Sequence, residues 1–208
     1  NEGLQIEQLI TKRILDVVFS MVGLIVSSPF FVIIGLLIKC TDSGPIFYRQ
    51  KRLTQGGKEF SICKFRTMIQ DAEKEMGARL AAENDERILP VGKFLRRTRL
   101  DELPQLWNIL KGEMSVVGPR PERPELAKKI EEEIPEFSYR LKVKAGLTGY
   151  AQIYGKYNTT SYDKLKLDLK YIRNYSLFLD LRLILMTPKI MFMKESTEGI
   201  MEDDAKEI

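Results

Sequence analysis

The sequence predicts a mixed α/β (α+β) protein, in which a small sheet is surrounded by helices and a membrane segment precedes the globular part. Three observations predict this class. A long uncharged run occupies residues 17–38, two short segments alternate like strands within residues 46–65, and several later segments have helical periodicity. The 208 residues suffice for one globular domain with its own core and a membrane anchor.

The uncharged run VVFSMVGLIVSSPFFVIIGLLI is long enough to cross a bilayer. Pro29 interrupts it and removes one backbone hydrogen bond, while Ser27 and Ser28 can satisfy freed carbonyls, so we expect a strong kink. Positive charge favours the cytoplasmic side of a membrane. A re-entrant helix that breaks at Pro29 and returns to the cytoplasmic face therefore fits the basic flanks, whereas a kinked span and a straight crossing both stay open. The flanking basic residues are Lys12, Arg13, Lys39, Arg49, Lys51 and Arg52.

A β-hairpin is expected directly after the membrane segment. Ile46 to Gln50 and Phe60 to Phe65 alternate like strands, and the Gly-Gly pair at residues 56–57 supplies the turn. This hairpin would carry Lys64 and Arg66, within KFRTM, to one end of the sheet. These two cations could bind phosphate or could simply be a solvated strand end.

The remaining segments are predicted mainly from periodicity. We expect a surface helix at residues 70–82, a solvated helix at 122–133, and a helix with Leu165, Leu169 and Ile172 on one face. Residues 142–149 form a glycine-containing loop, and Tyr150 to Tyr154 is expected to be a short strand. The apolar segment 177–193 is broken by charges and a proline, which is typical of a helix lying in the membrane interface.

The central stretch, residues 96–121, places an acidic pair between basic residues. Asp101 and Glu102 follow Arg96, Arg97 and Arg99 and precede Arg120, an arrangement suited to phosphates. Asp101 could simply be the N-cap of a helix that begins near Leu103 and ends at Lys111 with Gly112. The two interpretations are compatible, because a helix N-terminus would keep the carboxylate ionised and would favour a phosphate beside it.

Composition excludes several kinds of chemistry. The chain contains no histidine, which removes Ser-His and Cys-His catalysis and the commonest zinc ligand. Its two cysteines, Cys40 and Cys63, have no metal-ligand spacing and cannot form a disulfide framework. The net charge of +4 comes from basic residues scattered among aliphatic ones, which does not indicate a nucleic-acid binder. Carboxylates, lysine, arginine, hydroxyls or a hard metal ion must therefore carry any reaction.

Four motifs then occur in order behind the proline-broken segment. They are KFRTM, LDELPQLWNILKGEMSVVGPRP, GLTGYAQIYG and YIRNYSLFLDL. Together they resemble the bacterial sugar transferases, the monotopic phosphoglycosyl transferases that start exopolysaccharide, capsule and glycoprotein glycan synthesis. The resemblance extends from about Thr11 to Met193.

The resemblance implies a reaction and roles for individual residues. In that family an aspartate attacks the β-phosphorus of a UDP-sugar, expels UMP and carries the phosphosugar until a polyprenyl phosphate collects it. The acidic pair of the family falls on Asp101 and Glu102. Independently of the resemblance, Mg²⁺ binds few protein carboxylates plus phosphate oxygens, so it is the expected cofactor, bound at Glu102. The anchor there is a re-entrant helix. The residues expected to bind substrate or phosphate are Lys64, Arg66, Arg96, Arg120 and Asp180.

The sequence departs from the family pattern at several positions. Ala145 replaces a usual proline, Tyr150 a common tryptophan and Arg99 a common serine, and the segment at 153–156 also differs. None of these touches the acidic pair, so they bear on sugar preference and the glycine loop. The sugar itself is not determined by the sequence.

We therefore expect an enzyme that transfers a hexose 1-phosphate to undecaprenyl phosphate with Mg²⁺, on the cytoplasmic face of the bacterial inner membrane. Residues 1–40 would form the membrane helix, 41–195 the catalytic domain with interfacial helices, and 196–208 a disordered tail. Self-association into a homo-oligomer is left open. Two alternatives remain, an ordinary glycosyltransferase acting at the anomeric carbon and a non-catalytic membrane module that recruits a polysaccharide assembly machine.

Overall fold

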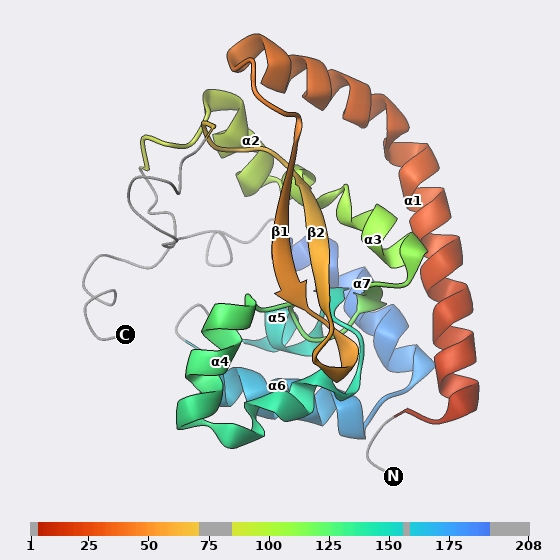
Figure 1. Ribbon diagram of the computed structural model, residues 1–208. Coiled ribbons are helices and arrows are strands. Elements are labelled where there is room, and N and C mark those ends of the chain that lie inside the picture. The colour runs from red at the N-terminus through yellow and green to blue at the C-terminus, as the bar shows by residue number, and fades with distance from the viewer. Residues whose placement is uncertain (1–3, 71–84, 156–158, 192–208) are drawn as a thin grey trace.

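The computed structural model describes residues 4–70, 85–155 and 159–191 and confirms the mixed α/β class. Helices surround two small sheets, and the long N-terminal helix α1, Ile6–Thr41, runs along one side of the molecule (Figure 1). The surface helix predicted at residues 70–82 lies, beyond Gln70, outside the described residues. The predicted tail at 196–208 lies outside them as well.

Helix α1 bends as the sequence predicts but does not break. Figure 1 shows its later part curving over the top of the molecule, although the helix is continuous through Pro29. The Ser28 hydroxyl donates to the carbonyl of Ile25, 2.8 Å away, which is the carbonyl that the proline leaves without its usual partner. By length and composition α1 could cross a membrane, and only 22% of its most apolar window is buried inside the structure.

The predicted hairpin is confirmed. Strands β1, Phe47–Leu53, and β2, Glu59–Phe65, pair antiparallel from Phe47 opposite Phe65 to Leu53 opposite Glu59. Gly56 and Gly57 in the connecting turn, η1 (Gln55–Gly57), both have positive φ, at 70° and 73°, which glycine adopts without steric cost.

A second sheet holds the centre of the domain together. Strand β3, Ser115–Val117, pairs parallel to β4, Gly146–Thr148, and the main core forms around this pair. Ile109, Met114 and Leu183 are completely buried there. The helices around the sheets are α2 (Pro90–Arg97), α3 (Gln105–Lys111), α4 (Pro124–Glu133), α5 (Tyr150–Tyr154), α6 (Ser161–Arg173) and α7 (Leu177–Met191), with short 3₁₀ segments η2 (Leu100–Glu102) and η3 (Pro135–Lys142).

The predicted strand at Tyr150 to Tyr154 is wrong, because this segment is the short helix α5. Five residues are too few to distinguish the two periodicities. The helical geometry brings the rings of Tyr150 and Tyr154 to a centroid distance of 4.5 Å with their planes tilted by 40°, and it buries Ile153 in the main core.

Helix α7 has two different faces. Leu183 is completely buried, whereas Phe178 is 76% exposed and Leu185 is 78% exposed. Large apolar side chains on the outer face agree with the prediction of a helix at the membrane interface. The helix predicted to carry Leu165, Leu169 and Ile172 on one face is confirmed as α6, in which Leu165 and Ile172 are buried.

Candidate active site

The acidic pair lies in η2, a single tight turn between α2 and α3. Arg99 immediately before it has φ 57° and is the one non-glycine residue with positive φ in the part of the chain that the structure describes. Such a conformation is strained for a residue with a side chain and is often found at functional sites. The turn buries both Asp101 and Glu102, each with 8% of its surface exposed.

The N-cap interpretation of Asp101 is therefore wrong in its geometry. Helix α3 begins at Gln105 with Pro104 at its N-cap, and Asp101 lies one turn upstream without a capping hydrogen bond. The tight turn at Leu100–Glu102 comes between Asp101 and the helix that the apolar pattern predicted. The predicted end of that helix is confirmed, since Gly112 adopts φ 86° as its C-cap.

Glu102 is the acidic centre of a cationic cluster. Its Oε1 lies 2.8 Å from Lys64 Nζ, 3.1 Å from Arg120 Nη2 and 3.8 Å from Arg99 Nη1. Burial alone would raise the pKa of Glu102, but Arg120, Lys64 and Arg99 together lower it far below its usual value. Glu102 is therefore ionised over the whole physiological pH range.

Asp101 is in the opposite electrostatic situation. Burial first, and then the charge of Glu102, raise the pKa of Asp101 to about 6, and nearby Lys64, Arg99 and Arg96 offset this only in part. Its Oδ1 is buried without a hydrogen-bond partner among the described residues. This corrects the expectation that a helix dipole keeps the carboxylate ionised. At neutral pH Asp101 is still mostly charged, and one of its oxygens is not engaged by any described donor.

Three of the predicted phosphate-binding residues lie around the pair. Lys64 and Arg120 contact Glu102 directly, and the charge of Arg96 acts on Asp101 while its Nε donates to Thr67 Oγ1 at 2.9 Å. Lys64 comes from β2, Arg96 from α2 and Arg120 from the segment after β3. The fold thus converges cations from three separate elements on one turn.

The structure does not bring the other two predicted residues to the pair. Arg66 donates to the Asp42 carboxylate at 2.7 Å and to the Asp42 carbonyl at 2.9 Å, and so fixes the loop after α1. Asp180 is buried against Lys12, 2.6 Å away, and the Tyr171 hydroxyl, 2.8 Å away. The partners of both are distant in sequence, so motif position alone could not place them.

Sequence reasoning missed a buried arginine that supports the site. Arg140 donates to the backbone carbonyl of Arg120 at 2.9 Å and pairs with Asp168 at 2.8 Å and Glu122 at 3.4 Å. It thereby holds the segment that aims Arg120 at Glu102. An arginine in a charged 3₁₀ segment carries no sequence signal for this contact.

The two carboxylates of the pair are candidate ligands of a divalent metal ion. No group of three acidic, histidine or cysteine side chains that could hold a metal occurs among the described residues. Mg²⁺, however, commonly binds through one or two carboxylates plus substrate phosphates. Glu102 is charged, and Asp101 offers an unpartnered carboxylate oxygen beside it, so the residues fit such an ion.

Comparison with known proteins gives a family match over most of the chain, since residues 7–194 match the family described as bacterial sugar transferase. The chain is 38% identical over 179 residues to a UDP-N-acetylgalactosamine-undecaprenyl-phosphate N-acetylgalactosaminephosphotransferase of Aeromonas hydrophila, a match that covers 85% of this chain and 42% of that protein.

Two further relatives are similar over comparable lengths. The chain is 40% identical over 193 residues to a UDP-glucose:undecaprenyl-phosphate glucose-1-phosphate transferase of Klebsiella pneumoniae, covering 90% of this chain and 41% of that protein. It is 38% identical over 194 residues to the exopolysaccharide production protein ExoY of Rhizobium meliloti (strain 1021), covering 85% of this chain and 83% of that protein.

The chain thus spans about two fifths of the length of the first two relatives and most of the third. The matched residues include nearly all of α1, the acidic pair and the convergent cations. This protein therefore belongs to the bacterial sugar transferase family.

Proposed function

We propose that this protein transfers a sugar 1-phosphate from a UDP-sugar to undecaprenyl phosphate through a covalent aspartyl-phosphosugar, with release of UMP. The observation that carries the proposal is the buried, unpartnered oxygen of Asp101 beside a Glu102 whose charge is held by Lys64 and Arg120. The names of two relatives, which specify transfer to undecaprenyl phosphate, support the choice of acceptor.

In the first step an oxygen of ionised Asp101 attacks the β-phosphorus of the UDP-sugar. A bond forms between that oxygen and phosphorus, and the bond from the β-phosphorus to the bridging oxygen breaks. UMP leaves with the bridging oxygen and its electron pair. No general base is needed, because the attacking carboxylate is already an anion, and this agrees with a chain that contains no histidine.

In the second step an oxygen of the acceptor phosphate attacks the same phosphorus. The bond to Asp101 breaks, which regenerates the carboxylate and yields the polyprenyl diphosphate sugar. The acceptor is also an anion, so this step needs no base either. Lys64, Arg96 and Arg120 neutralise the charge on the phosphates. Glu102 would hold Mg²⁺, which would supply further neutralisation of the diphosphate charge.

The anchor would supply the lipid substrate to this site. Helix α1 packs against α3, the helix that follows the acidic pair. The two helices approach closely at Gly23, where an added Cβ would lie 3.0 Å from the side chain of Leu106. We propose that α1 is re-entrant and that the domain lies on the cytoplasmic face. UDP-sugars are then available from the cytosol and the polyprenyl phosphate from the adjacent leaflet.

The decisive experiment identifies the released nucleotide with a panel of UDP-glucose, UDP-galactose and their N-acetylated forms. The proposal expects UMP, a trapped phosphosugar adduct on wild-type protein, and neither with Asp101→Asn. Full activity in Asp101→Asn would contradict the covalent mechanism. The two relatives name different sugars, so the panel also determines the donor.

The alternatives give different results in the same assay. An ordinary glycosyltransferase releases UDP in place of UMP. A non-catalytic module that recruits an assembly machine releases no nucleotide with any donor and is indifferent to substitution of Asp101. No described feature favours either alternative over the covalent route.

The re-entrant anchor has its own test, cysteine accessibility on the two ends of α1. The natural thiol Cys40 is exposed, and Asn1→Cys in a Cys40→Ser background reports the other end. We expect impermeant reagent to label both from the same side. Labelling from opposite sides would show a kinked crossing.

A further inference from the structure

A basic hollow adjoins the acidic pair, and it contains one cation, Arg52, to which no role has been assigned so far. The hollow is small and open to solvent, and its lining includes Arg52, Lys64, Arg120 and Gln105. Lys64 and Arg120 are the two closest cation partners of Glu102, so the hollow begins directly beside the pair. Arg52, from β1, is the remaining cation in its lining.

Arg52 has neutral partners only. Its Nη2 donates to Gln50 Oε1 at 2.7 Å and its Nη1 to the Pro121 carbonyl at a long 3.4 Å. Its Nε is buried without a partner, and Arg52 makes no ion pair with any described residue. A guanidinium in this position keeps its full charge and an unused donor, which is costly unless a ligand supplies the acceptor.

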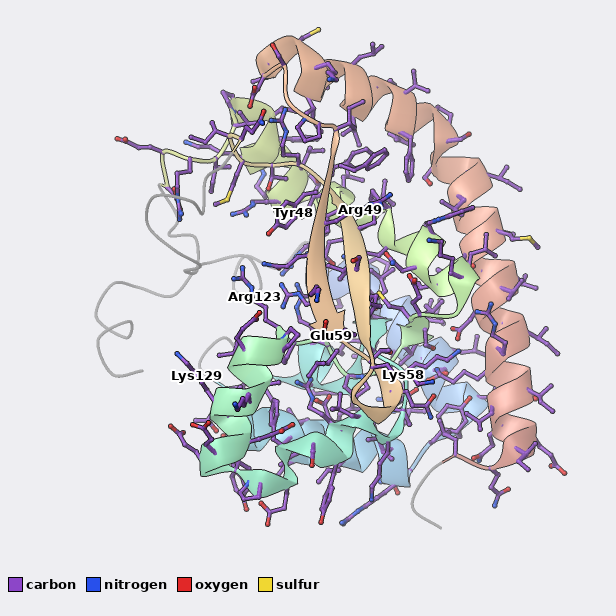
Figure 2. All side chains as sticks on the ribbon, in the orientation of Figure 1. Tyr48, Arg49, Lys58, Glu59, Arg123 and Lys129 are labelled. Carbon is purple, nitrogen blue, oxygen red and sulfur yellow. The ribbon has the colours of Figure 1, made fainter. Side chains whose placement is uncertain are left out.

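The surroundings of Arg52 strengthen the need for an anion. Burial, then repulsion by Arg123 and also Arg120, lower the pKa of Arg52, and Glu122 opposes this only in part. Figure 2 shows Arg123 by the start of α4, beside β1, and Leu53 of β1 donates to the Glu122 carbonyl at 3.0 Å. A bound anion would relieve the repulsion among these arginines.

The hairpin register aims Arg52 and Lys64 to the same side. Side chains on paired strand residues share a face, and successive residues alternate between faces. Arg52 pairs with Phe60 and Tyr48 pairs with Lys64, so both cations lie on the face that packs on the core. Arg49 pairs with Cys63 and lies on the opposite face, where it is exposed.

We propose that Arg52, together with Lys64 and Arg120, forms a subsite for a phosphate monoester dianion. Lys64 and Arg120 already contact Glu102, whereas Arg52 has no counter-charge in the same lining, so the hollow keeps positive charge that suits a phosphate monoester of about −2. The planar guanidinium can donate two parallel hydrogen bonds to such a group. Gln105, buried in the same lining, adds an amide that can orient the ligand.

The subsite rests on the proposed function for its ligands, because that reaction handles a phosphate monoester twice. UMP departs as one, and the polyprenyl phosphate arrives as another. Both displacements at the β-phosphorus are in line with the Asp101 oxygen, so the departing and the arriving phosphate occupy the same side. One cationic hollow beside the pair is therefore sufficient for both.

The test is equilibrium binding to the 208-residue chain in detergent, with UMP, farnesyl phosphate, inorganic phosphate and uridine as probes. Arg52→Gln is expected to weaken binding of the three phosphates roughly tenfold or more, as for loss of a charge-assisted hydrogen bond, and to leave uridine unaffected. The matched control is Arg49→Gln, which removes the same charge from the opposite face of the same strand and should change affinity less than about twofold.

The outcomes separate the two sources of the ligand. If Arg52→Gln binds both UMP and farnesyl phosphate more weakly, the result supports a shared subsite. If it binds only one of them more weakly, the result supports the subsite and assigns it to that substrate. Unchanged phosphate affinity, or an equal loss for uridine, overturns the proposal. If Arg52→Gln does not fold, Arg52→Lys carries the test, because lysine keeps the charge but not the two parallel donors. Unchanged affinity in Arg52→Lys would then overturn it.

Failure of the subsite and failure of the proposed function are distinguishable. If wild-type protein releases UMP but phosphate affinity does not depend on Arg52, only the subsite is contradicted. Binding that depends on Arg52, in a protein that releases no UMP with any donor, removes only the proposed reaction.

Discussion

Two clusters of buried carboxylates lie at different places in this fold, and they are built in opposite ways. The first is the acidic pair Asp101 and Glu102 in η2. The second, called here the α1 junction, consists of Lys12, Asp16, Tyr171 and Asp180, where the start of α1 meets α6, α7 and β3.

The α1 junction satisfies its carboxylates. One oxygen of Asp180 accepts a hydrogen bond from Lys12, and the other accepts one from the Tyr171 hydroxyl. Asp16 Oδ1 accepts from the Ser115 hydroxyl at 2.9 Å and from the Val116 amide at 2.8 Å. At the acidic pair, Asp101 keeps a buried oxygen without a described partner. A satisfied buried carboxylate stabilises the fold, whereas an unsatisfied one costs free energy and is retained for a ligand or a reaction.

The largest expected difference between the clusters is in stability. Asp180→Ala leaves Lys12 buried without its counter-charge, so the free energy of unfolding should fall by about 3–5 kcal/mol. Asp101→Asn removes an incompletely satisfied charge and should leave that free energy unchanged or raise it. Chemical denaturation of the 208-residue chain in detergent measures both changes in the free energy of unfolding.

A double variant serves as the control for the α1 junction. Replacing both charges, with Lys12→Met and Asp180→Leu, should recover much of the loss, because the penalty comes from the unpaired charge and not from the missing pair. A stable Asp180→Ala protein with weakened phosphate binding would instead return Asp180 to the substrate-binding role that the family resemblance implies.

The second expected difference is in titration. In metal-free protein Asp101 should titrate with a pKa of about 6, because burial and Glu102 disfavour its charge. Carboxylate infrared difference spectra between wild type and Asp101→Asn would measure this. Lys64→Met should raise the value further, since Lys64 lowers it. A midpoint near 4 in wild type would show that the site is more hydrated than its burial implies.

The sign of the linked stability effect follows from this shift. The native pKa of Asp101 lies above its ordinary value of 3.8, so the native state binds the proton more tightly than the unfolded chain does. The contribution of Asp101 to the free energy of unfolding therefore increases as pH falls from about 6 towards 4. Activity has the opposite dependence, because attack on phosphorus requires the ionised carboxylate.

The smallest expected effect concerns the contact that joins the two regions. Arg13, at the start of α1, donates to the carbonyls of Ile109 and Leu110 at the end of α3, both at 2.7 Å. Arg13→Gln should lower the free energy of unfolding by about 1–2 kcal/mol through loss of this cap. Lys39→Gln, at the exposed far end of the same helix, is the matched control and should change it by less than about 0.5 kcal/mol.

Local chemistry in the sequence was sufficient for several elements. The Gly-Gly turn and the alternating flanks predicted the hairpin, Gly112 predicted the end of α3, and Ser28 before Pro29 predicted how the kink satisfies its carbonyl. The strand predicted at Tyr150 to Tyr154 was wrong, because its helical state is decided by packing of Ile153 and not by a five-residue pattern.

The sequence by itself determined the family motifs, the absence of histidine chemistry and the identity of the acidic pair. Only the tertiary structure decided which charges meet. It placed Arg66 on Asp42 and Asp180 on Lys12, brought Lys64 and Arg120 to Glu102, and left Arg52 beside them with neutral partners. The physical reason is that burial and pairing of a charge depend on groups distant in sequence, whose approach is set by packing of the whole fold.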